Sequence, residues 1–443
     1  MLDTANSIKW QPPIPARTEQ YLRPRLRYSK PVPCYGTTTP RVTHCIGSLI
    51  PGGAERQLCN LVSHAARRGL DIRVMTRFNL TGDSAHYVDL LRHTGIMPVV
   101  AGSSFDPKFE KEMLKNPGCI KFLDQLPEFL LPWTADILGE LLRDPPDILH
   151  SWLDHNNICA GVAGLLADVP AIILSTRNVN PTHFPYLSHP LFKPWYQLLA
   201  NSPRVHFINN SRAGAQDYAD WLGIPVERFH VVLNGVDFDT LKYPNHHDIV
   251  RFRQEIELPD GAPLVAGVFR LSEEKRPLVF AEVVRRAMLQ LPHLHAVIAG
   301  VGPCEADLRK VIADAGLSHR FHLLGRRTDI PVIMTAADVF LLTSQKEGTP
   351  NVLLEAQWFG CPVVATKAGG TIDAISHNET GLLVEVDDID GLTTALVELL
   401  PDTERCARLG KAGPDFVKSR FGVERMVDET LAVYHHALSQ KFD

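Results

Sequence analysis

The sequence predicts an α/β protein made of two doubly wound, Rossmann-like domains, and three observations support this. Short apolar runs alternate with helical patterns along most of the chain, which is typical of parallel βαβ units. A polar stretch at 238–261 interrupts the alternation once. The length of 443 residues is typical of two or three domains. We therefore expect an arm at 1–40, a first domain at 41–240, a second domain at 241–422 and a last helix at 423–443 that packs back on the first domain.

The arm at 1–40 is rich in proline and shows no helical or strand period. It carries more basic than acidic residues, so it could touch an anionic membrane surface. Because those basic residues are spread out along the chain, a loosely packed arm with solvated charges is the favoured alternative.

The first domain is expected to contain six strands and at least two helices. The strands are expected at 42–49, 72–76, 148–151, 171–175, 206–209 and 230–233, and the helices at 54–68 and 87–93. The apolar stretch at 158–174 is broken by Pro170 and too short to cross a membrane, so a buried helix leading into a buried strand fits better. The apolar segment at 119–142 is favoured as a buried capping helix over a membrane-facing one, because Pro127 and Pro132 interrupt it.

The second domain repeats the pattern after the polar stretch, which we interpret as the linker. Its strands are expected at 264–268, 295–299, 321–324, 339–342, 362–365 and 381–384. The acidic residues at 387–390 precede a helix and are interpreted as its first turn, so no metal site is expected there. The histidine pairs of the chain, including His435 with His436, lack the spacing of helical metal ligands and are interpreted as surface residues.

Composition excludes several classes of function. With 45% hydrophobic and 21% charged residues, the chain is expected to be globular. A net charge of -5 supplies no global field that would attract nucleic acid, so no nucleic-acid partner is expected. The eight cysteines have no zinc-finger or C-x-x-C spacing, which indicates reduced, mostly buried thiols of a cytoplasmic protein. No signal-peptide pattern opens the chain.

Two glycine motifs follow expected strands. Gly52 and Gly53 open a helix, where backbone N–H groups and the positive helix end can face a phosphate, although glycines before a helix are also common turn residues. Gly300 and Gly302 are not followed by a third glycine at the required spacing, so a dinucleotide fingerprint is not supported.

Charged residues follow two expected strands of the second domain. Arg270 and Lys275 lie at a carboxyl-terminal strand edge, where open α/β sheets bind ligands, and could hold a diphosphate; a surface salt bridge is an equal alternative. Glu347 precedes a helix that begins at Asn351, and Glu355 lies one turn into that helix. This layout suits the binding of hydroxyls beside a phosphate, or Glu355 simply favours the helix start electrostatically.

Taken together, the ordered motifs resemble those of the retaining glycosyltransferases of family four, also called group 1. The resemblance covers about residues 41–435. It rests on Gly-Gly-Ala-Glu-Arg-Gln at 52–57, Asn210-Ser211, Asn234-Gly235-Val236-Asp237, Arg270 with Lys275, Gly300 with Gly302, Gly325, the block at 347–370 and the strand at 380–384. It implies the GT-B fold, in which two Rossmann-like domains face each other across a cleft.

The resemblance also implies roles for individual residues. Arg270 and Lys275 would neutralise the diphosphate leaving group, Glu355 would bind the ribose hydroxyls and Glu347 the transferred sugar. The further donor-binding positions that it implies are Gly52, Gly53, Arg326, Gly348, Thr349, Pro350, Asn351, Val352 and Leu353. It implies no metal and no cofactor beyond the nucleotide-sugar substrate.

The acceptor side departs from the pattern of many family members, which carry His-x-His at the end of the fourth strand. Here the sequence is His150-Ser151-Trp152-Leu153-Asp154-His155, followed later by Arg177-Asn178. A subgroup with this pattern makes His155 the candidate acceptor-side group. On geometry alone, a helix-capping or otherwise satisfied histidine is an equal alternative.

The main hypothesis is therefore a cytoplasmic glycosyltransferase, with peripheral contact at the inner face of the membrane as an option. It would move a hexose from a nucleotide donor, with uridine diphosphate preferred, to a saccharide or lipid-linked saccharide. The alternatives are a nucleotide-sugar epimerase on the same fold, which would convert the donor without an acceptor, and a non-catalytic partner subunit. Partner subunits tend to lose the charged residues that are present here.

Overall fold

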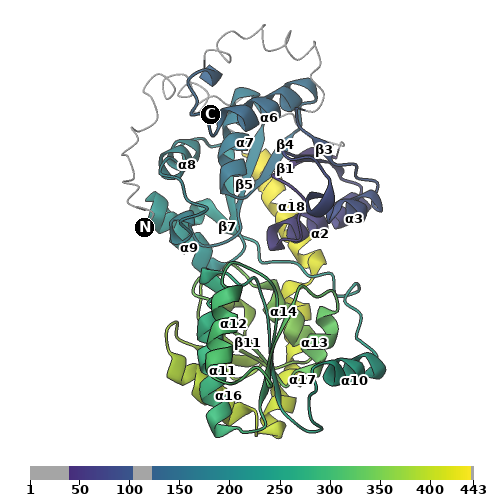
Figure 1. Ribbon diagram of the computed structural model, residues 1–443. Helices are drawn as coiled ribbons and strands as arrows, with labels where there is room; N and C mark the ends of the chain where they lie inside the picture. Colours follow the sequence, from purple (N-terminus) through teal and green to yellow (C-terminus); the bar gives the residue numbers. More distant parts are fainter. Residues whose placement is uncertain (1–38, 103–121, 441–443) are drawn as a thin grey trace. The chain divides into compact units, whose positions relative to one another are not determined.

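The computed structural model describes residues 39–102 and 122–440 (Figure 1). The arm expected at 1–40 lies outside the described residues except for its last two positions, and so does the beginning of the segment at 119–142. The chain divides into two compact units. The first unit comprises Met1–Asn209, Ala215–Val231 and Asp428–Asp443, and the second comprises Asn210–Gly214 and Val232–Val427.

The first unit is built on a parallel sheet of seven strands in the order β3-β2-β1-β4-β5-β6-β7. The strands are β1 (Arg41–Ile46), β2 (Asp71–Thr76), β3 (Val99–Val100), β4 (Ile148–Trp152), β5 (Ala171–Thr176), β6 (Val205–Asn209) and β7 (Phe229–Val231). Every residue of β4, β5 and β6 is buried, as expected for parallel strands covered on both faces.

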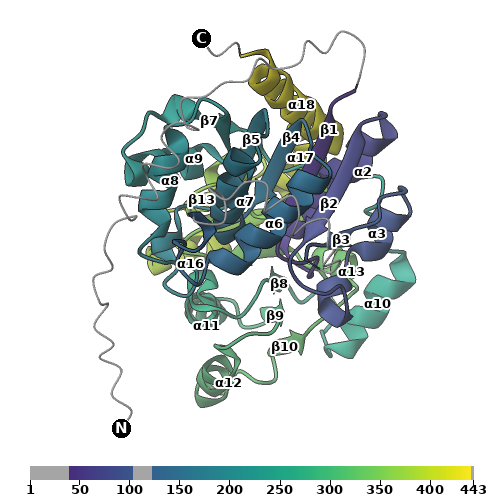
Figure 2. The ribbon, with the colours of Figure 1, turned by 90° about the horizontal axis from the view of Figure 1, so that it is seen from above.

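Helices pack around this sheet. They are α2 (Gly53–Arg67), α3 (Val88–Arg92), α6 (Leu131–Arg143), α7 (Asp154–Leu166), α8 (Phe192–Ala200), α9 (Arg212–Leu222) and the larger part of α18 (Val423–Ser439), with short 3-10 turns at Gly82–Ala85, Pro181–His183 and Val226–Arg228. Figure 2 shows α8 and α9 beside the β7 end of the sheet and α2 and α3 beside the β2 end. The expected helix and strand positions agree with these to within a few residues.

The second unit has a parallel sheet of six strands in the order β10-β9-β8-β11-β12-β13. The strands are β8 (Leu264–Val268), β9 (His295–Ala299), β10 (Phe321–Gly325), β11 (Val339–Leu342), β12 (Val363–Thr366) and β13 (Gly381–Val384). The helices are α10 (His246–Glu255), α11 (Pro277–Gln290), α12 (Glu305–Asp314), α13 (Ile330–Ala336), α14 (Asn351–Trp358), α15 (Thr371–Ala374), α16 (Ile389–Leu399) and α17 (Thr403–Phe421), with a 3-10 turn at Glu273–Lys275.

The polar stretch at 238–261 is not a plain linker, because it contains α10. The Asn245 side chain caps this helix by accepting a hydrogen bond from the Asp248 N–H at 2.9 Å. Phe252 is the one buried residue of the helix, Ile249 and Val250 are half-buried, and the remaining positions are polar. Three apolar residues within four positions give no repeated helical period, so the helix is not recognised from the sequence.

The burial expected for the apolar segment near 119–142 is confirmed over its described part. Phe122, Leu130 and Trp133 are almost completely buried in the core of the first unit. Pro132 lies at the start of α6, where its missing N–H is not needed. Within the described ranges, no helix is both long enough and apolar enough to span a bilayer. All six cysteines in these ranges are free thiols, and four of them are buried.

Gly300 and Gly302 allow close contact between two backbone segments. The loop after β9 runs beside the segment after β8, where the Leu271 N–H donates to the Val301 carbonyl at 3.1 Å. A Cβ at Gly302 would lie 2.4 Å from the Leu271 carbonyl oxygen, and one at Gly300 would lie 1.9 Å from that of Phe269. These glycines therefore position the loop that carries Arg270.

Replacing Gly302 with alanine should destabilise the second unit by about 1–3 kcal/mol, because the new methyl group meets backbone rather than a movable side chain. Urea unfolding followed by circular dichroism measures this change. Val301→Ala is the matched control, since Val301 is exposed and its truncation should change stability by no more than about 0.5 kcal/mol. Equal stabilities for the two variants would contradict the steric explanation.

Candidate functional site

The polar residues singled out in the second unit gather at the carboxyl ends of three neighbouring strands. Lys275 follows β8, Glu347 follows β11, and Gly370 follows β12. In an open parallel sheet, this edge is where ligands bind, because the strand ends and the amino-terminal ends of the following helices meet there.

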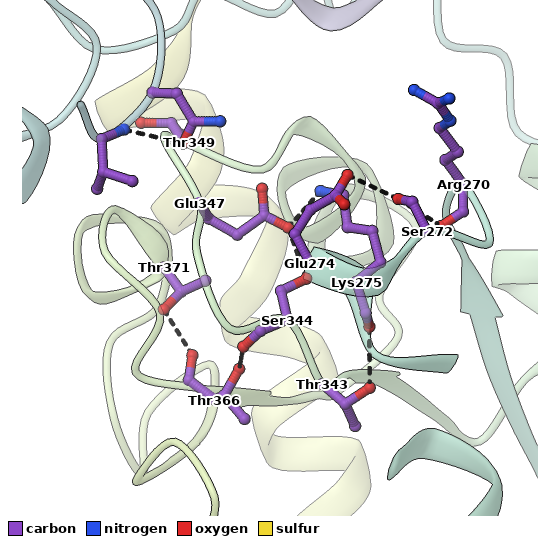
Figure 3. A network of polar contacts seen from close by, with 12 residues as sticks. Arg270, Ser272, Glu274, Lys275, Thr343, Ser344, Glu347, Thr349, Thr366 and Thr371 are labelled. Carbon is purple, nitrogen blue, oxygen red and sulfur yellow. Dashed lines mark hydrogen bonds and ion pairs between the residues drawn. The ribbon is translucent and has the colours of Figure 1, made fainter. Parts of the chain in front are cut away.

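An ion pair between Lys275 and Glu347 lies at the centre of this edge (Figure 3). The Ser344 hydroxyl donates to the same Glu347 oxygen, Oε1, at 2.7 Å. Glu347 is only 6% exposed, so its charge must be compensated by these partners. The cation of Lys275 is held over the strand ends, with its side chain 23% exposed.

The loops around this pair are fixed by hydrogen bonds to backbone carbonyls. The Gly370 N–H donates to the Glu347 carbonyl at 3.1 Å, and the Thr366 hydroxyl donates to the Ser344 carbonyl at 2.5 Å. Thr371 in turn donates to the Thr366 carbonyl at 2.6 Å. Figure 3 shows these hydroxyls beneath the ion pair. The position of Glu347 therefore depends on groups from both β11 and β12.

The start of α14 is held by buried asparagines. The Asn234 side-chain amide donates to the Thr349 carbonyl at 2.9 Å and to Asn351 Oδ1 at 2.8 Å. The Thr349 hydroxyl donates to the Asn210 carbonyl, and the Asn210 amide donates to Asn234 Oδ1 at 3.3 Å. Gly348 and Pro350 are buried in the same turn. This network fixes the amino-terminal end of α14, whose partial positive charge favours an anion.

Glu355 lies one turn into α14 and is 7% exposed, so a second carboxylate is buried close to that helix end. Val352 and Leu353 occupy the first turn, and the Leu353 N–H donates to the Pro350 carbonyl at 3.1 Å. A cation, a helix start and two buried carboxylates can together bind a ligand that carries both phosphate and hydroxyl groups.

Arg270 and Arg326 are exposed at the edges of this region. In Figure 3 the Arg270 side chain extends away from the Lys275–Glu347 pair, while its carbonyl accepts a hydrogen bond from the Ser272 N–H at 2.8 Å. Arg326 follows Gly325, which has a φ of +65°, and lines a surface hollow together with residues of α10. Both side chains are therefore accessible from the surface.

In the first unit, Gly52 and Gly53 form the start of α2, as expected. The Glu55 carboxylate folds back over Gly52; a Cβ at Gly52 would lie 2.1 Å from Glu55 Oε2, so that carboxylate would have to move to accommodate a side chain. Burial raises the pKa of Glu55 to about 7. The pattern Gly-Gly-Ala-Glu therefore places Glu55, a carboxyl group with a raised pKa, beside the start of α2. The sequence alone does not reveal this raised pKa.

His155 lies in the first turn of α7, and its Nε2 donates to the Phe129 carbonyl at 2.8 Å. The ring is packed near Phe129, at 6.1 Å between centroids. Desolvation by burial lowers the pKa of His155 below its ordinary value. At neutral pH the ring is therefore neutral, with Nδ1 as the nitrogen that can accept a proton.

His150 belongs to a buried polar cluster. Its Nδ1 lies 2.6 Å from the Tyr434 hydroxyl and its Nε2 lies 2.7 Å from Ser175 Oγ. Burial lowers the pKa of His150 well below its ordinary value. The neighbouring Trp152, which replaces the second histidine of the His-x-His pattern, lies 4.8 Å beneath the Arg177 guanidinium. These side chains satisfy one another, and no sequence motif connects Tyr434 with the strand residues.

Ser344, Thr366 and Thr371 are the supporting residues of the second-unit site that sequence reasoning missed. Isolated serines and threonines after strands carry no distinctive spacing. Asn210 and Asn234 were part of recognised motifs, but only the structure reveals that they hold the Thr349–Asn351 turn.

Comparisons with known proteins identify the family. Residues 51–240 match the family described as Glycosyltransferase Family 4, and residues 248–416 match the family Glycosyl transferases group 1. The Vi polysaccharide biosynthesis protein VipC/TviE of Salmonella typhi is 28% identical over 92% of this chain and 73% of its own length. The UDP-Gal:alpha-D-GlcNAc-diphosphoundecaprenol alpha-1,3-galactosyltransferase of Escherichia coli is 29% identical over 79% of this chain and 88% of its own length.

Among solved structures, HepE from Anabaena in complex with UDP-glucose has a similar fold. Its TM-score is 0.70 at 22% sequence identity, covering 90% of this chain and 100% of that chain. At this identity the likeness concerns the fold, which is GT-B.

Because the folded-state pKa of Glu55 is raised, the folded protein binds a proton that the unfolded chain loses near pH 4.5. The contribution of Glu55 to stability should therefore fall as the pH rises from about 4.5 to about 7. Relative to the parent protein, Glu55→Gln should gain about 2–3 kcal/mol of unfolding free energy between pH 5 and pH 8. Urea titrations at the two pH values measure this gain.

The matched control is Glu227→Gln, because Glu227 is an exposed carboxylate of the same unit. As an exposed substitution, Glu227→Gln should change the free energy of unfolding by no more than about 0.5 kcal/mol at either pH. A pH-independent difference for Glu55→Gln as well would show that Glu55 ionises normally in the folded protein.

Proposed function

The chain belongs to the family 4, or group 1, glycosyltransferases, and on that basis we propose that it transfers a hexose from a UDP-sugar to a saccharide or lipid-linked saccharide, with retention of anomeric configuration. Glycosyltransferases of this family use nucleotide sugars in glycan biosynthesis. The observation that carries the finer proposal is the Lys275–Glu347 pair beside the start of α14, with Glu355 buried one turn further on.

In this proposal, positive charge stabilises the departing nucleoside diphosphate. The cation of Lys275 faces the diphosphate, and Arg270 reorients from the surface toward it. The N–H groups of Asn351 and Val352 supply the helix end, and the Leu353 N–H closes its first turn on the Pro350 carbonyl. Negative charge develops on the diphosphate as the glycosidic bond breaks, so these groups act most strongly in the transition state. The cationic side chains supply the charge that a metal ion would otherwise provide.

The two carboxylates bind hydroxyl groups. Glu355 accepts hydrogen bonds from the ribose, and Glu347 contacts the transferred sugar. Glu347 can do this because its Oε1 already accepts hydrogen bonds from Lys275 and Ser344, which orients the carboxylate. Gly348, Thr349 and Pro350 shape the turn around the sugar, and the backbone after Gly325, at Arg326, contacts the base.

In the first unit, Gly52 and Gly53 offer a second helix end suited to a phosphate, and His155 acts on the acceptor side. The neutral His155 ring, oriented by the Phe129 carbonyl, presents Nδ1 as a hydrogen-bond acceptor for a hydroxyl. Its lowered pKa suits this role, because the ring stays unprotonated near neutral pH.

The preference for UDP and for a lipid-linked acceptor is supported by similar proteins. The name of the Escherichia coli relative specifies UDP-Gal as donor and a diphosphoundecaprenol-linked sugar as acceptor, and the Anabaena structure is a complex with UDP-glucose. The Salmonella relative is named for polysaccharide biosynthesis. A lipid-linked acceptor would require the protein to associate peripherally with a membrane surface.

Isothermal titration of the protein with UDP, GDP and ADP, followed by the matching sugar nucleotides, tests the donor site. UDP should bind selectively. Glu355→Gln should weaken its binding about 10- to 100-fold, because hydrogen bonds to a charged group contribute about 1.5–3 kcal/mol each. Glu398→Gln, an exposed carboxylate on α16 of the same unit, is the matched control and should bind like the parent. Preference for another nucleotide would overturn the choice of UDP, and no binding would overturn the site.

Lys275→Ala should lower the rate of sugar transfer about 100- to 1000-fold, as loss of a transition-state charge contact does. It should also destabilise the protein by about 1–3 kcal/mol, because it leaves the buried Glu347 carboxylate without its cation. The double variant Lys275→Ala/Glu347→Gln should recover most of that stability but no activity. Recovery of activity together with stability would mean that Lys275 serves only the fold.

A further inference from the structure

Three histidines from distant parts of the sequence converge in the first unit. His206 lies on β6, His230 on β7 and His436 on α18. One ring nitrogen of each lies within 4.8 Å of the others. Among the described residues, no other group of three histidine, cysteine or acidic side chains meets so closely. We propose that this cluster, the His206–His230–His436 site, binds a divalent transition-metal ion of the Zn²⁺ class.

Strand register explains why two of these histidines share one face of the sheet. Ile208 of β6 pairs with His230 of β7, and His206 precedes Ile208 by two residues. Side chains two apart on a strand point to the same side, so His206 and His230 are diagonal neighbours. Their ring centroids are 6.1 Å apart. β7 is an edge strand of the sheet, and β6 is its neighbour.

The last helix supplies the third ring from the same face. The C-terminal part of α18 lies against the sheet of the first unit, where Tyr434 contacts His150 (Figure 1). His436 is two residues further on, and its ring centroid lies 5.8 Å from that of His206 and 5.5 Å from that of His230. The rings thus form a nearly equal-sided triangle.

The innermost ring has a nitrogen that needs a partner. His206 is 5% exposed, and its Nε2 is buried with no hydrogen-bond partner among the described residues. A buried polar atom without a partner is costly, and a metal ion would satisfy it. Neutral imidazole is the form of histidine that binds a metal ion.

The chemistry and spacing suit three imidazole ligands. Zn–N bonds of about 2.1 Å at tetrahedral angles place ligand nitrogens about 3.4 Å apart. Side-chain rotations that move the ring nitrogens by roughly 1 Å would therefore complete the site. His436 is exposed, which provides an entry path and leaves a fourth position for water. The Gln440 amide, 2.8 Å from His436 Nε2, can support that ring from outside.

One neighbouring charge opposes a cation. Arg228 is close enough to lower the pKa of both His206 and His230. Its guanidinium is directed toward backbone, however, donating to the carbonyls of Ala200 and Val205 at 3.0 Å each. The positive charge of Arg228 therefore lowers the affinity of the site for a cation, but its guanidinium does not lie between the three rings. A bound ion would tie α18 to the edge of the sheet, which makes the role structural and separate from sugar transfer.

Titration of untagged, metal-free protein with ZnCl₂ tests this proposal, with Co²⁺ absorption as a second readout of tetrahedral coordination. The parent protein should bind one equivalent at this site and unfold at a higher temperature with Zn²⁺ present. His230→Ala and His436→Ala should each weaken that binding at least about tenfold and abolish the thermal shift. Since His436 is exposed, its replacement should leave the fold intact.

His435→Ala is the matched control, because His435 is an exposed neighbour of His436 on the same helix and is not part of the cluster. It should bind Zn²⁺ like the parent. Equal Zn²⁺ affinity and thermal shift in the parent, His230→Ala and His436→Ala would overturn the proposal, as would the absence of saturable binding by the folded parent. Nucleotide binding should be unaffected in all variants, so this test is independent of the donor site.

Discussion

The compensation of a buried carboxylate is the constraint on which the second-unit site depends. Glu347 is almost completely buried at the edge of a parallel sheet, and an unpaired charge there would be strongly unfavourable. Lys275 from the end of β8 and Ser344 from the end of β11 satisfy one oxygen, and the Gly370 N–H from beyond β12 holds the backbone of Glu347. The three strand ends are therefore coupled, and the arrangement that satisfies Glu347 also presents a cation and a carboxylate to a ligand.

The two units use helix starts in different ways. In the second unit, the start of α14 is fixed by side chains, since Asn234 bonds to both Thr349 and Asn351. In the first unit, the start of α2 is open backbone at Gly52, over which Glu55 folds. One helix end is thus rigidly prepared, whereas the other is covered by an acid that ionises near neutral pH. The donor site proposed in the second unit therefore has a helix end that is already fixed by hydrogen bonds, whereas the helix end of the first unit is covered by a side chain that can move.

The last helix matters more to the first unit than its position in the sequence indicates. Tyr434 completes the hydrogen bonds of the buried His150, and Asp428 pairs with Arg68. His436 completes the histidine triangle with β6 and β7. Residues of the last helix therefore pack against strands that lie more than 200 positions earlier in the sequence. His150 and Tyr434, for example, are 284 residues apart.

The sequence by itself determined the α/β class, nearly every strand, the α2, α14 and α18 helices and the family, because alternating periodicity and ordered local motifs are properties of neighbouring residues. It also singled out Lys275, Glu347 and Glu355 as candidate site residues, but did not reveal that Ser344 bonds to Glu347 or that Thr366 holds the backbone of Ser344. Tertiary structure alone decided the asparagine network, the raised pKa of Glu55 and the meeting of His206, His230 and His436. His435 and His436 are adjacent and look equivalent in the sequence, yet only His436 joins the cluster. Burial and contacts between distant segments set these features, and no local pattern encodes either one.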